Sequence, residues 1–91
     1  MVVPAPALAQ AVRNPARQAR LARLLRQPTT QVVALDRVEA AHVGRLLARS
    51  RTSDIADAHV VVCAQRSGTT VVTSDAADLR RLDPGLRLQE V

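Results

Sequence analysis

The sequence has 91 residues, 47% of them hydrophobic and none aromatic, and 13 basic against 8 acidic side chains give it a formal net charge of +5. This length predicts one small domain, residues 1–91, and excludes a second. The charge favours nucleic acid or another polyanion as a partner, but the lack of aromatic residues disfavours binding by base stacking, as in RRM and OB domains.

The beginning of the chain predicts one strand and two helices. Val2-Val3 is typical of the last residues of a short buried strand. A helix is expected over 5–13, with proline near its first turn. Asn14-Pro15 then starts a second helix over 16–26.

The middle of the chain predicts another strand and two longer helices. A short apolar strand is expected over 31–35. Asp36, with Glu39 three residues later, forms an N-terminal capping pattern for a helix that runs to Arg51. The helix over 54–66 is apolar around most of its circumference, so we expect it to be buried against a sheet.

The end of the chain predicts a strand, a helix and a final strand. Residues 70–73 have the β-branched content of a sheet interior. Ser74-Asp75 opens a helix that ends near Leu82, and a turn leads to the last strand over 86–91. Because short strands alternate with helices, the sequence predicts an α/β domain with a mainly parallel sheet.

Carboxylates stand where apolar structure is expected to continue. Asp57 interrupts an apolar helix, and Asp75 follows strand 70–73 at the carboxyl end, where open α/β sheets bind ligands. Carboxylates that meet at one sheet edge repel each other, and a divalent cation that prefers oxygen ligands holds them together. Another interpretation needs no metal, because Asp54 and Asp75 can serve as helix caps. Neither cap nor helix dipole explains Asp57, which lies a full turn inside its predicted helix.

The remaining candidate ligands predict no second site. Asp57 and His59 are two positions apart on a helix, so their side chains point about 160° apart and cannot share an ion. His59 is expected to be a packing or surface residue. No His/Cys set with zinc spacing and no glycine-rich phosphate loop is found.

The only cysteine, Cys63, cannot form an internal disulfide, which fits a reducing cytoplasm, and we expect a packed thiol. The first residues lack both a basic leader and a long apolar core, so secretion is not predicted. No stretch approaches the ~18 apolar residues of a membrane span, so no membrane segment is predicted.

Basic side chains recur at every third position of the second predicted helix, at Arg17, Arg20, Arg23 and Arg26. This arginine stripe has two interpretations. It either follows a phosphate backbone or is a solvated helix face.

The carboxylate segment resembles a known family. The pattern is Asp-Ala, an apolar helix, Gly, an apolar strand and Thr-x-Asp, and it is found in 52–64, Gly68 and 71–79. This pattern resembles the C-terminal half of PIN domains and is similar to the VapC-type toxins of toxin–antitoxin pairs. Weaker similarity extends back to residues 2–10, so the resemblance covers most of the chain.

The resemblance implies a three-layer domain and a metal-dependent ribonuclease. In this family, acidic residues bind Mg²⁺ or Mn²⁺ and activate water for attack on RNA. Asp57 and Asp75 match as catalytic and metal-binding residues, and Asp54 and Asp78 are accessories. A cognate antitoxin, a homodimer and a cytoplasmic location follow from the same resemblance.

The chain departs from the family pattern near its start. Family members begin with a central strand that carries an Asp, which this chain lacks, and Gln10 stands where a second acid is expected. We therefore expect an N-terminally incomplete domain, the C-terminal two-thirds of the fold, preceded in the DNA by about 30 to 45 in-frame codons for one βα unit. The alternative function is a catalytically inactive PIN-like remnant that binds protein or nucleic acid.

Overall fold

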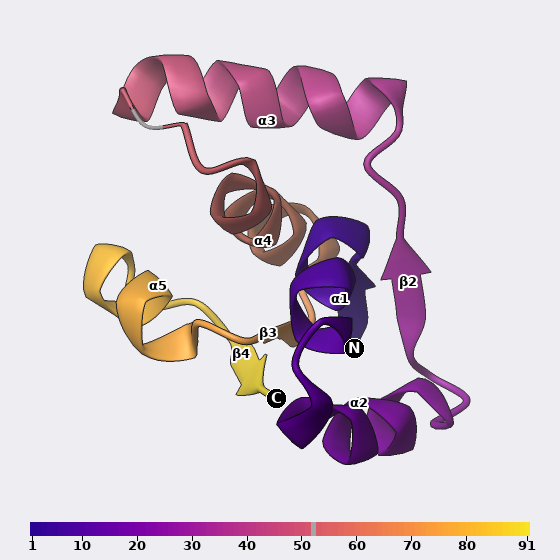
Figure 1. Cartoon of the computed structure of the whole chain (residues 1–91). Helices are drawn as coiled ribbons and strands as arrows, with labels where there is room; N and C mark the ends of the chain where they lie inside the picture. Colours follow the sequence, from indigo (N-terminus) through magenta and orange to yellow (C-terminus); the bar gives the residue numbers. More distant parts are fainter. Residues whose placement is uncertain (52) are drawn as a thin grey trace.

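The computed structural model describes residues 1–51 and 53–91 and contains a four-stranded parallel sheet with helices on both faces (Figure 1). Its elements in chain order are β1 (Val2–Pro4), α1 (Ala5–Val12), the 3₁₀ helix η1 (Pro15–Arg17), α2 (Gln18–Leu25), β2 (Gln31–Val33), α3 (Arg37–Ser50), α4 (Ile55–Ser67), β3 (Val71–Thr73), α5 (Ala76–Leu82) and β4 (Leu88–Glu90). This arrangement confirms the predicted α/β class with a parallel sheet. No described helix is long and apolar enough to cross a membrane.

Local capping patterns fix where the helices begin and end. The carboxylate of Asp36 accepts the backbone N–H of Glu39 at 2.9 Å, as the capping pattern predicts. The side chain of Asn14 accepts the N–H of Ala16 at 3.1 Å and starts η1, which α2 continues. Helix α4 ends at Gly68, whose left-handed conformation (φ +64°) costs glycine little.

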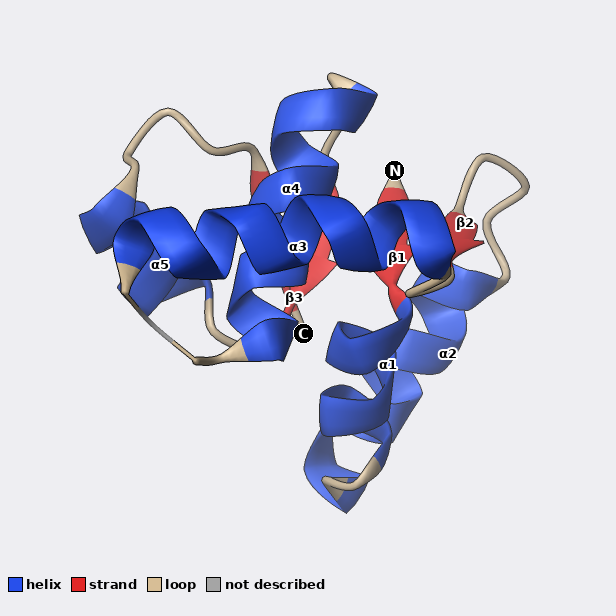
Figure 2. Ribbon diagram, turned by 90° about the horizontal axis from the view of Figure 1, so that it is seen from above, coloured by secondary structure: helices blue, strands red, loops and turns tan. Residues whose placement is uncertain are grey.

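The inner strands direct alternate side chains into two helical layers. Val2 and Val71 face a core that includes residues of α4 and α5, and Val3 and Val72 face one built with α1 and α2. Helix α3 packs on α4, with Val43 against Ala58 and Val62 of α4. Viewed from above, α3 crosses over α4 (Figure 2). Helix α4 is therefore covered by the sheet on one side and by α3 on the other.

The strand order is β2-β1-β3-β4, so β1 is an inner strand with a parallel neighbour on each side. The described strands thus form one continuous sheet, and the expectation that the family's Asp-bearing central strand is missing from this chain stays a prediction. The seam between β1 and β3 is nevertheless short, with the single register pair Val2–Val71, whereas three pairs join β1 to β2 and three join β3 to β4. Strand β1 carries no carboxylate. An upstream βα unit with an Asp in its first strand stays a prediction, which the DNA before the Met1 codon tests.

Candidate metal centre

Asp57 lies in the first turn of α4. The helix begins at Ile55 with Asp54 as its N-cap, and the Asp54 carboxylate accepts the N–H of Asp57 at 2.9 Å. An acidic residue three positions after the N-cap is favoured by the helix dipole. The argument that Asp57 lies too deep in the helix for such an effect is therefore wrong. The case for a metal at Asp57 rests instead on the side chains that surround it.

Asp75 stands between β3 and α5. It occupies the N-cap position of α5, but its side chain makes no capping hydrogen bond. Its backbone N–H donates to the hydroxyl of Thr73 at 3.2 Å. The cap interpretation thus does not account for the Asp75 carboxylate, which lies at the carboxyl end of an inner parallel strand, where such sheets bind ligands.

One pocket of about 350 Å³ brings the predicted site residues together. It is enclosed by α1, η1, the start of α4 and the end of β3, and its lining residues are Ala7, Gln10, Arg13, Arg17, Asp54, Ala56, Asp57, Val60, Thr73, Ser74 and Asp75. Asp57 and Asp75 meet here as predicted, and Gln10 lies in the same pocket, where the resemblance places an acid. Arg13 is a lining residue that the sequence analysis missed, because no pattern in α1 indicates that its end reaches this pocket.

The carboxylates of this region influence one another. Burial raises the pKa of Asp57 above its ordinary value of 3.8, and the charges of Asp54, Asp75 and Asp78 raise it further. Burial also raises the pKa of Asp75, followed by the charges of Asp78, Asp54 and Glu90. The neighbouring carboxylates thus oppose the ionisation of Asp57 and Asp75. Because the donors in the pocket are oxygen atoms, they fit a hard divalent ion such as Mg²⁺ or Mn²⁺.

The sequence matches the PIN domain family over residues 1–84. The chain belongs to the PIN domain family. No curated protein and no solved structure matches it. PIN domains are in general divalent-metal-dependent nucleases that act on nucleic acids. The family and the pocket therefore agree on a nuclease-type function.

The raised pKa values predict that the acidic pocket lowers the stability of this PIN domain at neutral pH when no metal is bound. A carboxyl group with a raised pKa in the folded state stabilises the fold only while it is protonated, and this contribution is lost as the pH rises through the folded-state pKa. At pH 7 the ionised Asp57 therefore destabilises the metal-free protein. Asp57→Asn is expected to raise Tm by a few degrees in EDTA, because it removes the repulsion between carboxylates. Replacing residues of functional sites often stabilises a protein in this way.

Thermal denaturation followed by circular dichroism measures this difference. The matched control is Asp83→Asn, which removes the same charge from a turn and keeps an oxygen to accept the N–H of Gly85. An Asp57→Asn variant that is no more stable than the control would contradict the electrostatic interpretation of the pocket.

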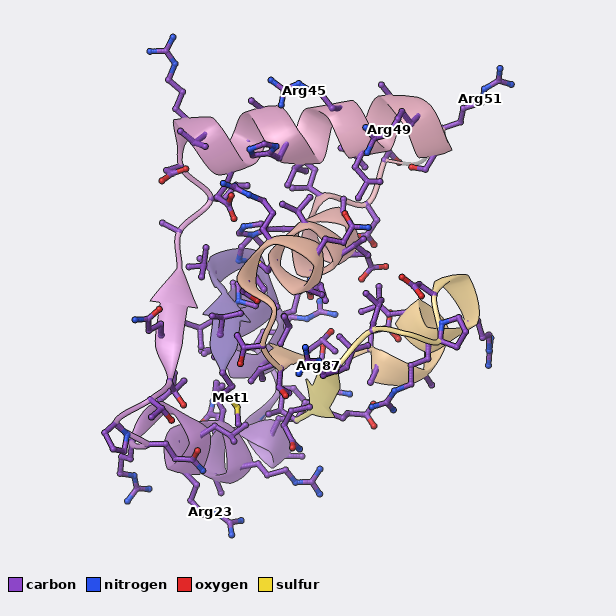
Figure 3. All side chains as sticks on the ribbon, turned by 180° about the vertical axis from the view of Figure 1, so that it is seen from behind. Met1, Arg23, Arg45, Arg49, Arg51 and Arg87 are labelled. Carbon is purple, nitrogen blue, oxygen red and sulfur yellow. The ribbon has the colours of Figure 1, made fainter. Side chains whose placement is uncertain are left out.

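Arginine side chains complete the pocket of the PIN domain. Of the arginine stripe, Arg17 lines the pocket, whereas Arg20, Arg23 and Arg26 are exposed. Arg23 points away from the body of the molecule, beyond α2 (Figure 3). Arg13 joins Arg17 in the pocket. Guanidinium groups beside carboxylates suit a phosphodiester that lies next to a bound metal.

His59 and Cys63 lie apart from the acidic pocket. His59 is fully buried, which confirms packing and rules out a surface position, and its Nε2 atom lies 3.2 Å from Oε1 of Glu39. Burial, followed by the Glu39 carboxylate, raises the pKa of the Cys63 thiol to about 12. Cys63 is therefore a neutral, packed thiol at pH 7 and no nucleophile. The conclusion that no His/Cys set suits a metal is incomplete, because Glu39 of α3 joins these residues. The four-residue spacing of His59 and Cys63 on one helix was the available signal.

Proposed function

We propose that this PIN domain is a metal-dependent endoribonuclease of the VapC toxin type. Asp57 and Asp75 hold Mg²⁺ or Mn²⁺ in this proposal, and Asp54 is an accessory. The observation that supports it most is the single pocket that contains these carboxylates together with Arg13 and Arg17. Acidic and basic side chains in one pocket suit the two charges of the reaction, those of the metal ion and the phosphate.

The side chains divide the work of phosphodiester hydrolysis between them. When bound, the divalent ion supplies a Lewis acid and lowers the pKa of the attacking water. Asp57 and Asp75 bind the ion, and Asp54 fixes the backbone of α4 at Asp57 by accepting the N–H of that residue. Arg13 and Arg17 hold the phosphate and offset the negative charge that builds up on it.

The test of this proposal is metal-dependent cleavage of single-stranded RNA. We expect EDTA to reduce the cleavage rate at least about 100-fold, because the charge stabilisation and the activated water both depend on the ion. Added Mg²⁺ or Mn²⁺ should restore the rate, and gel analysis of an end-labelled RNA measures it. Asp75→Asn protein, prepared in the same way, is the control for a contaminating nuclease. Cleavage that persists in EDTA would rule out this mechanism.

A second candidate function is a PIN-like remnant that binds without cleaving. Two observations favour it: β1 carries no carboxylate, and the pocket offers the neutral side chain of Gln10 where the family pattern has an acid. RNA binding that weakens steeply with salt, without cleavage in Mg²⁺ or Mn²⁺, would support this alternative.

We also propose a cognate antitoxin as protein partner, with a homodimer as the free form, both in the cytoplasm. Exposed apolar side chains support a protein partner, since Val32, Leu35 and Val38 are 50%, 37% and 57% exposed along β2 and the start of α3. Strand β2 is also an edge of the sheet. The free Cys63 fits a reducing compartment. Light scattering of the purified chain distinguishes the homodimer from a monomer.

A further inference from the structure

Three different metal-ligating side chains meet between α3 and α4, away from the acidic pocket. Glu39 comes from the first turn of α3, and His59 and Cys63 come from successive turns of α4. The Oε1 atom of Glu39 lies 3.2 Å from Nε2 of His59 and 3.7 Å from Sγ of Cys63. The three ligand atoms all lie within 4.8 Å of one another, and all three residues are buried.

These separations suit a small tetrahedral ion. With zinc-ligand bonds of about 2.0–2.3 Å, tetrahedral geometry places nitrogen and oxygen ligands about 3.3 Å apart, and sulfur and oxygen ligands about 3.6 Å apart. The distances from Glu39 to His59 and to Cys63 agree with both values. The third separation, between the ligand atoms of His59 and Cys63, is within 4.8 Å, compared with about 3.6 Å in such a site.

The cluster is polar although it lies buried between two helices. Among the described residues, Nδ1 of His59 has no hydrogen-bond partner, although the side chain is fully buried. Buried polar groups reduce stability unless they are well paired. Apolar residues would pack α3 on α4 at a lower desolvation cost than these three side chains, so the convergence of three ligand types favours a metal-binding role.

We propose that Glu39, His59 and Cys63 form a binding site for Zn²⁺ or a similar borderline divalent ion, in addition to the acidic pocket. A thiolate, an imidazole and a carboxylate together select such an ion over Mg²⁺. The thiol proton leaves to solvent when the sulfur binds the ion. The ion would join α3 to α4 and so stabilise the packing of the two helices.

The surroundings of the cluster support this site. The guanidinium of Arg66 pairs with Oε2 of Glu39, which fixes the carboxylate with Oε1 towards the histidine and the cysteine. Hydrogen bonds of this kind hold metal-binding carboxylates in place. A pocket of about 490 Å³ is lined by Glu39 and Cys63 and gives an ion and a fourth ligand, such as water, access from solvent.

The decisive experiment is the absorption spectrum of the metal-free, tag-free chain with Co²⁺, which replaces Zn²⁺ in tetrahedral sites. We expect a thiolate-to-cobalt band in the near ultraviolet, at one ion per chain, that Zn²⁺ abolishes. Because Cys63 is the only cysteine, such a band reports this sulfur and no other. Absence of the band, or one ion for two chains, would overturn the proposal.

Variants locate the ion within the chain. Cys63→Ser is expected to lose the band, and both Cys63→Ser and His59→Gln to bind Zn²⁺ about 100-fold more weakly. The matched control is the double variant Asp57→Asn with Asp75→Asn, which alters only the acidic pocket and should keep the band and the Zn²⁺ affinity. A band lost in this control but retained in Cys63→Ser would assign the ion to the acidic pocket and overturn the proposal.

A thermal denaturation experiment on the unmodified chain tests the site even if the variants fail to fold. Zn²⁺ at about 100 times its Kd is expected to raise the Tm of the unmodified chain by about 10 °C, because it binds the folded form. The double variant should show the same rise. No rise in the unmodified chain would contradict a site that joins α3 to α4.

Discussion

Replacing Asp57 by Asn is expected to lower the affinity for Mn²⁺ by about 100-fold. Removing a residue that only hydrogen-bonds to a metal ligand already lowers metal affinity about 10- to 100-fold. The amide is nearly isosteric with the carboxylate but carries no charge. Asp57 borders the pocket together with Asp54 and Asp75, so its charge is a large part of what attracts the ion. Calorimetric titration of the metal-free protein with Mn²⁺ measures the change.

Two further variants make this result specific. Asp75→Asn should weaken Mn²⁺ binding to a similar extent, and the double variant should lose little more, because residues that bind one ion do not contribute additively. Asp83→Asn, the matched control, removes a charge from an exposed turn and should leave the affinity unchanged. If Asp57→Asn bound Mn²⁺ as tightly as the unmodified chain, the metal assignment would be wrong.

Gln10→Glu is expected to raise Mn²⁺ affinity by about 10- to 100-fold. This is the same factor by which affinity falls when a residue that supports a metal ligand is removed. Gln10 lines the same pocket as Asp57 and Asp75, so the variant adds a carboxylate where the family pattern has one. Without metal, the added charge should lower Tm, since neighbouring carboxylates already oppose the ionisation of Asp57 and Asp75. Calorimetry with Mn²⁺ and thermal denaturation in EDTA measure the two effects.

The same variant distinguishes the two candidate functions. RNA cleavage that appears only with Gln10→Glu would show that the natural chain is a remnant whose pocket lacks one charge. Cleavage by the unmodified chain that rises in the variant would support the nuclease. Gln27→Glu is the matched control, because Gln27 is exposed and lies outside the pocket. Equal effects of the two variants would mean that net charge, and not the pocket, governs metal binding.

The sequence by itself determined most of the secondary structure and the class of fold. The capping pattern of Asp36 with Glu39, the β-branched strand over 71–73 and the glycine after α4 act within a few residues of the chain, so their effects can be read from neighbouring positions. The position of Asp75 directly after a buried strand also predicted that it lies at the carboxyl ends of the strands, because parallel strands end on the same side of the sheet. The error at Asp57 came from one boundary, since Asp54 caps α4 and places Asp57 in its first turn.

Only the tertiary structure decided which distant side chains meet. Gln10 joins Asp57 and Asp75 because α1 runs from the end of β1, which lies beside β3 in the sheet. Glu39 reaches Cys63, 24 residues further on, because α3 packs on α4. Periodicity identifies the face of a helix but not the element that covers that face, since the cover depends on strand order and on the packing of the whole core. Both candidate metal sites are products of such packing.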